Sequence, residues 1–181
     1  NQTDRNFNGI QDEDDAPASW AMINPSTGTL LRVKNFDWGF NYLSRPAFDP
    51  IAKRLYINNG GRVQIYYTDT QTLLVDTVFH GDVQGIDYFN SNDAVLLSLA
   101  IRPNFTDPGT VLVIDVEGNV IFTFKAGINV QQGKFINLSN DRDGLVILSE
   151  GVFGQHSSML HVVREKEAGS GIMEFDSLNL G

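Results

Sequence analysis

Cysteine is absent from this chain of 181 residues. Its absence excludes disulfide bridges, zinc–thiolate centres and thiol catalysis, and it indicates no particular compartment. Basic residues are also scarce, with 13 Lys and Arg against 22 Asp and Glu and a formal net charge of −9. A nucleic-acid partner requires a basic face that neutralises phosphates, so we expect none here. No apolar run approaches the roughly 20 residues of a membrane-spanning helix, so we expect no membrane span.

Sequence motifs of catalysis are missing as well. The chain contains no G-x-S-x-G, H-E-x-x-H, P-loop or G-x-G-x-x-G pattern. We interpret the three histidines, His80, His156 and His161, as structural rather than as a metal site. Aspartates are favoured at strand ends and turns, and we assign this role to Asp87, Asp93, Asp115, Asp141 and Asp143. The sequence therefore predicts no enzyme, although a glycosidase-type carboxylate pair depends on three-dimensional spacing and stays open.

Short apolar runs rich in β-branched and aromatic residues fill residues 62–101. Their length and composition are typical of strands. Turn residues at 68–71, 80–82 and 90–93 separate the runs. These breaks are too short for crossover connections, so we expect each run to pair with the next as an antiparallel hairpin. A four-stranded antiparallel meander of about 45 residues is the unit of a β-propeller blade.

The pattern recurs along the chain. Thr27–Leu31 and Thr70–Leu74 share T-x-T-L-L, and Gln84-Gly85 returns as Gln132-Gly133. The spacing of about 43 to 48 residues is typical of propeller blades. We therefore predict an all-β, β-propeller-like domain over residues 20–181. The predicted blades cover residues 20–61, 62–109, 110–158 and, in part, 159–181.

Several motifs resemble the YVTN-type propeller repeat of surface-layer and secreted proteins. They are Pro46 with Asp49-Pro50, Leu55–Asn58 and Val113–Asp115, and the resemblance covers roughly residues 20–163. The second and third predicted blades lack the P-x-x-x-D-P element. The resemblance implies a propeller fold and an extracellular or cell-surface location, and it implies no activity.

An acidic segment at residues 1–15 has the spacing of a calcium loop. Oxygen ligands stand at positions 1, 3, 5, 9 and 12 of a twelve-residue loop, with Gly9 at position 6 and a backbone carbonyl at position 7. The proposed Ca²⁺ ligands are Asp4, Asn6, Asn8, Ile10, Asp12 and Asp15. The segment resembles a thrombospondin type 3 or dockerin-like loop, and residues 16–19 form a linker behind it. The alternative is a solvated acidic tail.

Two further surface features are apparent. The aromatic segment with Phe36, Trp38, Phe40 and Tyr42 is typical either of a carbohydrate or partner surface, or of side chains that enter the core or cover a sheet edge. Sequons at Asn104 and Asn137 are candidate glycosylation sites of a glycoprotein, as is Asn1.

Together these features predict a non-catalytic, extracellular, calcium-stabilised β-repeat module in surface or fibre assembly or adhesion. Three blades and part of a fourth leave sheet edges open. We therefore expect a larger parent ring, or self-association in which the strand Ile172–Leu180 or the N-terminal acidic arm takes part, or a different stacking of the meanders as a sandwich or a solenoid. One alternative is the accessory carbohydrate- or substrate-binding propeller of a secreted enzyme. Another is a propeller that holds a small molecule or metal in its channel.

Overall fold

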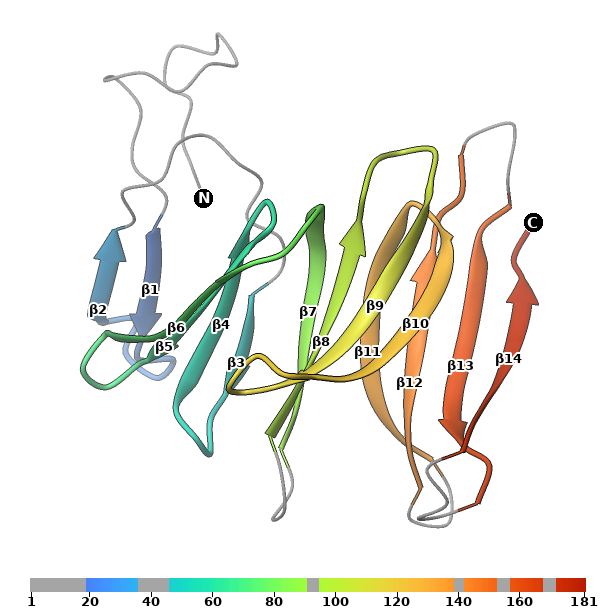
Figure 1. Cartoon of the computed structure of the whole chain (residues 1–181). Coiled ribbons are helices and arrows are strands. Elements are labelled where there is room, and N and C mark those ends of the chain that lie inside the picture. The colour runs from blue at the N-terminus through green and yellow to red at the C-terminus, as the bar shows by residue number, and fades with distance from the viewer. Residues whose placement is uncertain (1–18, 36–45, 91–94, 139–141, 153–156, 168–171) are drawn as a thin grey trace, which may run out of the picture. The chain divides into compact units, whose positions relative to one another are not determined.

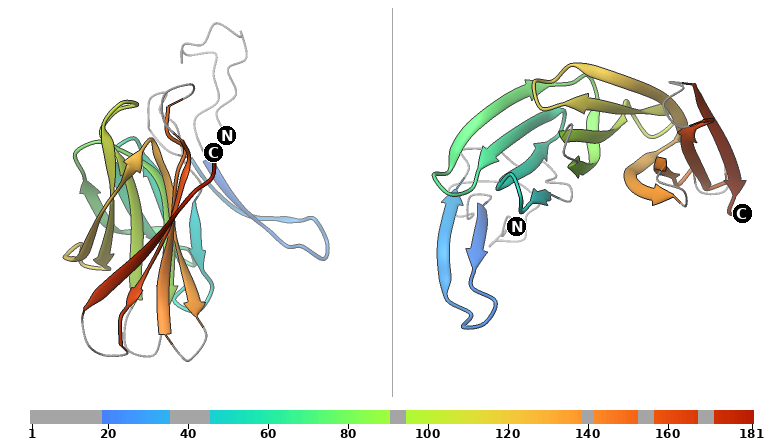
Figure 2. Two further views of the ribbon diagram at one scale, coloured as in Figure 1. Left: turned by 90° about the vertical axis from the view of Figure 1, so that its right-hand side faces the viewer. Right: turned by 90° about the horizontal axis from the view of Figure 1, so that it is seen from below.

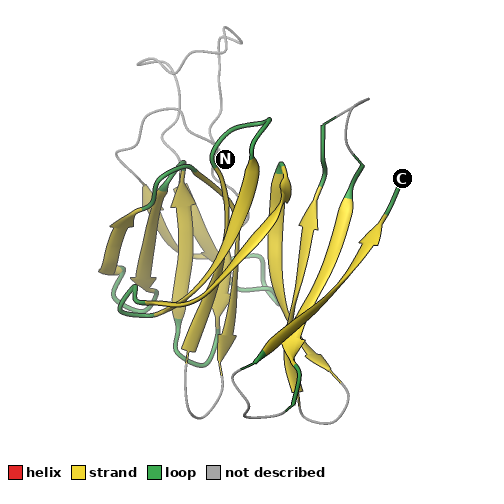
Figure 3. Cartoon of the chain, turned by 45° about the vertical axis from the view of Figure 1, so that its right-hand side comes forward, coloured by secondary structure: helices red, strands yellow, loops and turns green. Residues whose placement is uncertain are grey.

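The computed structural model describes residues 19–35, 46–90, 95–138, 142–152, 157–167 and 172–181. Within these ranges every regular element is a β-strand, as Figure 3 shows, and the predicted all-β class is confirmed. The same residues contain no helix with the length and apolar character needed to cross a membrane. The chain forms two compact units, Asn1–Leu43 and Ser44–Gly181.

The first unit contains one described hairpin. Strands β1 (Ser19–Ile23) and β2 (Leu30–Asn35) pair antiparallel. Asn24 organises the turn between them, because its side-chain oxygen accepts the backbone N–H of Ser26 at 2.9 Å. Gly28 completes this turn with φ 69°, a left-handed conformation that glycine adopts without strain.

The second unit contains twelve strands in three antiparallel sheets of four, each in simple sequence order (Figure 1). The first sheet comprises β3 (Ala47–Asp49), β4 (Arg54–Asn59), β5 (Arg62–Tyr67) and β6 (Thr72–Val78). The second comprises β7 (Asp82–Asn90), β8 (Val95–Arg102), β9 (Pro108–Asp115) and β10 (Val120–Ile128). The third comprises β11 (Val130–Leu138), β12 (Arg142–Ser149), β13 (Met159–Glu165) and β14 (Met173–Asn179).

The second sheet lies between the other two in the right-hand view of Figure 2. Two separate apolar clusters hold the three sheets together. Tyr56, Ile65, Leu97 and Leu99 belong to the cluster of the first and second sheets. The second cluster joins the second and third sheets through residues such as Val111 and Ile147. Because each strand alternates its side chains between two faces, the second sheet contributes one face to each cluster.

The predicted grouping of strands into sheets is wrong, because each predicted sheet is displaced by two strands along the chain from an observed one. The runs at 72–78 and 82–90 do not pair as a hairpin, because β6 ends the first sheet and β7 begins the second. Residues 159–179 complete the third sheet as β13 and β14 instead of starting a fourth. The grouping was mispredicted because the link at 79–81, which joins two different sheets, is as short as a hairpin turn. Backbone bonds from Phe79 N to Gly61 O (2.7 Å) and from Val83 N to Gly60 O (2.9 Å) fasten this link to the β4–β5 turn.

The repeat itself has a structural basis despite this shift. Thr27–Leu31 and Thr70–Leu74 both lead from a turn into the second strand of a hairpin, β1–β2 in one case and β5–β6 in the other. Leu30 and Leu73 are both largely exposed, at 57% and 42%. The T-x-T-L-L motif therefore marks equivalent hairpins, although it does not mark the beginning of a sheet.

Candidate functional site

The third sheet has two unlike faces, and we define both by the cross-strand register. The proximal face contains Leu145, Ile147 and Val163, which belong to the cluster shared with the second sheet. The distal face contains the alternate residues of the same strands. Its middle row is Lys134, Val146, Val162 and Asp176, each directly opposite the next across the sheet. Among the described strands, the extensive contacts of the third sheet with another sheet are those with β7 to β10 of the second sheet.

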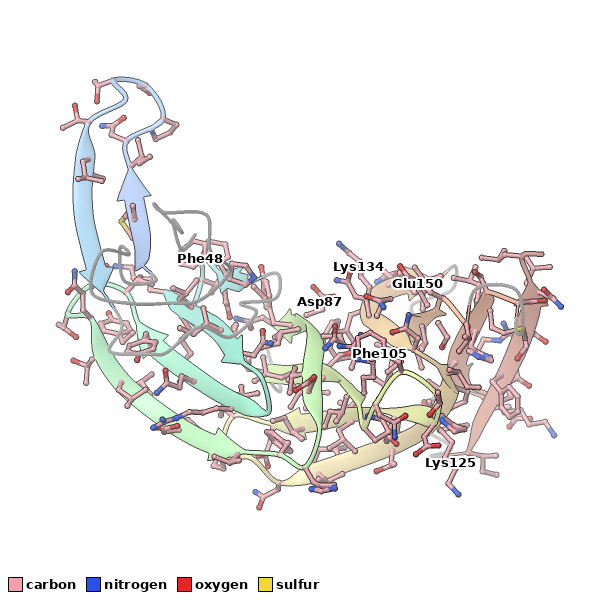
Figure 4. All side chains as sticks on the ribbon, turned by 90° about the horizontal axis from the view of Figure 1, so that it is seen from above. Phe48, Asp87, Phe105, Lys125, Lys134 and Glu150 are labelled. Carbon is pink, nitrogen blue, oxygen red and sulfur yellow. The ribbon has the colours of Figure 1, made fainter. Side chains whose placement is uncertain are left out.

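Specific hydrogen bonds join the proximal face to the second sheet. Ser98 on β8 donates its hydroxyl to the backbone oxygen of Gly133 at 2.8 Å. The Asp87 carboxylate on β7 accepts the backbone N–H of Phe135 at 2.8 Å. Asp87 and Lys134 are labelled in Figure 4. Burial raises the pKa of the Asp87 carboxyl above its ordinary value, while the Phe135 N–H and the Lys134 charge act in the opposite direction. The polar groups at this contact therefore have defined partners.

Asp87 corrects one expectation. We expected it at a strand end or turn, but it lies inside β7 and bonds to another sheet. Asp115 follows the expectation, because its side chain accepts the N–H groups of Glu117 and Asn119 in the turn after β9. Asp93 and Asp141 lie outside the described residues, as does the side chain of Asp143.

His161 lies on the proximal face and is almost fully buried. Its Nδ1 lies 2.7 Å from the Ser177 hydroxyl, and its ring packs on Phe124 with centroids 5.3 Å apart. Within the described part of the chain, its Nε2 has no hydrogen-bond partner. Burial lowers the pKa of His161 below its usual value of 6.5, so the ring is neutral at physiological pH. His80 lies in the link between the first two sheets, and His156 is outside the described residues.

The distal face has an apolar centre between charged edges. Val146, Leu148, Leu160 and Val162 form its centre on the two middle strands, and all are partly buried. On β13 and β14, Arg164 contacts Glu174 at 2.8 Å and Asp176 at 3.0 Å. The hydrogen bond to Glu174 raises the pKa of Arg164 above its ordinary value. Apolar centres with polar rims are typical of protein–protein interfaces.

A cavity of about 390 Å³ lies between the second and third sheets. Its lining is mainly apolar and includes Phe122, Phe135 and Met173. Of the residues that line it, Glu165 alone is charged. A pair of titratable groups is therefore absent from this lining, and the cavity offers no acid–base arrangement.

Of the three candidate glycosylation sites, Asn1 lies outside the described residues and Asn104 is in an exposed loop. Its side-chain oxygen accepts the N–H groups of Thr106 and Asp107 at 2.8 and 2.7 Å, and its amide donates to the Asp107 carboxylate at 2.7 Å. This arrangement orders the loop, and the accessible amide is compatible with the predicted modification without testing it. Asn137 is exposed on β11.

The other predicted site residues lie outside the described part of the chain. These are the calcium ligands Asp4, Asn6, Asn8, Ile10, Asp12 and Asp15, and the aromatic residues Phe36, Trp38, Phe40 and Tyr42. Among the residues that the structure does describe, no group of three or more His, Cys, Asp or Glu side chains could hold a metal. Calcium binding and the aromatic ligand surface stay predictions.

The distal face was not recognised from the sequence. The strands Met159–Glu165 and Met173–Asn179 were assigned to an incomplete fourth blade, which hid their pairing with β12. Alternation of charged and apolar residues in β14 was the available signal. It shows which side chains share a face, but it cannot identify the strand that lies beside them.

Comparison of the sequence with protein-family models and with curated proteins finds no match. Two solved structures align with this chain. A protein of unknown function from Bacteroides caccae aligns with a TM-score of 0.49 and 10% identity, over 88% of this chain and 68% of that one. The complex of the fission yeast SREBP-SCAP binding domains aligns with a TM-score of 0.51 and 13% identity, over 90% of this chain and 46% of that one. At such low identity the second likeness extends to the fold alone, and this chain spans about half of that longer protein.

Proposed function

We propose that this protein is a non-catalytic β-repeat module that acts outside the cell, by assembly or adhesion, and that its four-stranded sheets are blades of the β-propeller type. The distal face of the third sheet is the observation that carries the proposal. Val146, Leu148, Leu160 and Val162 give it an apolar centre, and Lys134 and the Arg164–Glu174–Asp176 ion pairs lie at its edges. An apolar centre between charged edges is typical of surfaces that bind a partner.

The repeated architecture supports the blade assignment. Each sheet is a meander, and neighbouring sheets are joined by an apolar cluster together with side chain to backbone bonds. Asn58 donates to the Val83 backbone oxygen between the first two sheets, and Ser98 donates to Gly133 between the next two. Radial repetition of four-stranded sheets with short connections is how propellers protect their strands. The sequence resemblance to YVTN-type repeats agrees with this assignment and with a cell-surface location.

Calcium stabilisation is the second part of the proposal, and it rests on the spacing of the oxygen ligands between Asp4 and Asp15. The test is sedimentation velocity of the full chain in calcium and in a chelator. We expect larger species in calcium that return to monomer after chelation. A single size in both conditions, at every concentration, would contradict calcium-dependent assembly.

Two aspartates in the loop provide a matched pair of variants. Asp12→Ala removes a predicted ligand at position 9, while Asp14→Ala removes an equal charge at position 11, which coordinates nothing. Calorimetric titration should show calcium affinity reduced at least about tenfold by Asp12→Ala and little changed by Asp14→Ala. Equal losses would indicate general attraction of cations by an acidic tail.

A further inference from the structure

The distal face of the third sheet differs in its residues from the face of the second sheet that packs on the third sheet. The row of the second sheet that faces the third sheet is Asp87, Ser98, Val113 and Phe122. The corresponding row on the distal face is Lys134, Val146, Val162 and Asp176. The two middle residues of each row are small or apolar, but the end residues differ. The row of the second sheet ends in Asp87 and Phe122, whereas the distal row ends in Lys134 and Asp176.

This difference indicates which partner the distal face fits. Between the second and third sheets, the Asp87 carboxylate accepts a backbone N–H of the next sheet. Lys134 is the β11 residue of the middle row on the distal face, and its ammonium group has donors but no acceptor. The same contact therefore cannot be repeated there. A partner that presents a carboxylate opposite Lys134 and a cation opposite Asp176 complements both charges, in addition to the Arg164–Asp176 contact and the interaction of the Lys134 charge with Asp87.

A second copy of this face presents both groups. We propose that the distal face binds the distal face of another copy of the chain, related by a two-fold axis parallel to the strands. This operation places β11 of one copy over β14 of the other. Because Lys134 and Asp176 end the same row, each lysine then lies opposite the partner's Asp176, and the pairing occurs twice. Val146 lies over the partner's Val162, so the apolar centres meet.

The charges of the face favour this occupant. The chain carries a net charge of −9, yet the distal face bears Lys134 and Arg164 against Glu174 and Asp176. Charges of both signs on this face, with Arg142 also at a distal register position, reduce the repulsion that two acidic copies would otherwise experience. The Asp176 side chain is 72% exposed despite its contact with Arg164, so it remains accessible to a partner. Closed two-fold interfaces of this self-complementary kind are the commonest in soluble oligomers.

The area of the distal face determines how strong a dimer we expect. Four strands spaced about 4.8 Å apart, with six residues at about 3.3 Å each, give a face of roughly 19 by 20 Å. Two such faces bury on the order of 800 Å² in total, which is below the usual area of a stable interface. We therefore expect a weak, concentration-dependent dimer. Sedimentation equilibrium from about 1 µM to about 1 mM should show it.

The absence of cysteine from the chain makes a specific cross-linking test available. In the two-fold arrangement, K134C of one copy faces D176C of the other, whereas two K134C positions lie at opposite edges. Treatment of an equal mixture of K134C and D176C with a short bis-maleimide, which spans the roughly 10 Å between facing sheets, should therefore give a covalently linked dimer. Each variant alone should give at least about tenfold less, because its two cysteines lie at opposite edges of the interface, about 14 Å further across the sheet. The mixture of K125C with D176C is the matched control, because Lys125 lies on β10 of the second sheet.

The inference rests on the proposed function, and the outcomes separate the two. Preferential cross-linking of the K134C and D176C mixture, together with wild-type dimers, supports the inference. Self-cross-linking of D176C alone would overturn it in favour of edge pairing between two β14 strands, because Asp176 is the central residue of that strand. Wild-type assembly without preferential cross-linking would also overturn it, while leaving the proposed assembly role intact. A wild-type monomer at every concentration, in calcium as well, would overturn both.

Discussion

Adjacent residues of the third sheet occupy very different surroundings, although they belong to the same strands. On β12, Ile147 is fully buried against the second sheet, while Val146 and Leu148 on either side lie on the distal face and stay partly exposed. The proximal face joins its neighbour through apolar packing and defined hydrogen bonds from Ser98 and Asp87. The distal face has similar apolar residues at its centre but charges at its edges. The buried face and the partly exposed face of the same sheet therefore differ mainly in the residues at the ends of their rows.

Substitution of neighbouring β12 residues should show the largest difference between the faces. Ile147→Ala creates a cavity where the side chain has no exposure, so we expect a loss of about 3 kcal/mol in the free energy of unfolding. Val146→Ala removes less buried area, and we expect a loss of about 1 kcal/mol or less. Urea denaturation at a concentration where the protein is monomeric measures both. Equal losses would show that the distal face is also buried in the monomer.

A substitution that adds volume to the proximal face should also lower the free energy of unfolding more than a substitution on the distal face does. A Cβ at Gly133 would lie 2.6 Å from the Ser98 Oγ and 2.8 Å from the Val111 Cγ1. Val111 is fully buried and β-branched, so it has little freedom to move. We expect Gly133→Ala to cost about 1 to 3 kcal/mol, measured by the same denaturation experiment.

Lys134→Ala is the matched control for Gly133→Ala, because it alters the next residue of β11, which belongs to the distal row. Its side chain is exposed, so we expect a change within about 0.5 kcal/mol. A neutral result for Gly133→Ala would mean that the second and third sheets pack less closely than the distances indicate.

Acidic pH should lower the free energy of unfolding through protonation of His161 on the proximal face. The pKa of this residue is lowered by burial, so the unfolded chain binds a proton more readily than the folded protein. The neutral ring is compatible with folding above the unfolded pKa of 6.5, and the free energy of unfolding should fall as pH decreases below that value. Thermal melts of the wild type and of His161→Gln, compared at several pH values, measure this smaller effect. His80→Gln is the control, because His80 is exposed. A pH profile unaffected by His161→Gln would place the titration elsewhere.

Much of the local structure was predictable because it depends on short-range patterns. The short apolar runs within Val111–Asp115 and Leu55–Asn58 correspond to β9 and β4. The turn at Asp115 followed from the tendency of aspartate to accept backbone N–H groups two to four residues ahead. The T-x-T-L-L repeat was recognised for the same reason, since both copies lead into the second strand of a hairpin.

The grouping of strands into sheets was not predictable, and the candidate site depended on it. The link at residues 79–81 joins two sheets, and the link at residues 60–61 joins two strands of the same sheet. Both links are short. Only the hydrogen bonds from Phe79 and Val83 to the β4–β5 turn distinguish them. Asp87 was misassigned for a similar reason, because its partner Phe135 is 48 residues away in the sequence.

The sequence by itself determined that the chain is all-β, that its strands are joined by short turns, and that its surface is acidic. These properties follow from local conformational preference and composition, which act over a few residues. Tertiary structure decided which strands share a sheet and which alternate residues are buried. It also brought Lys134 and Asp176 to opposite ends of one row. The reason is that strand pairing depends on contacts between distant segments, and the two faces of a sheet become different only when one of them is covered.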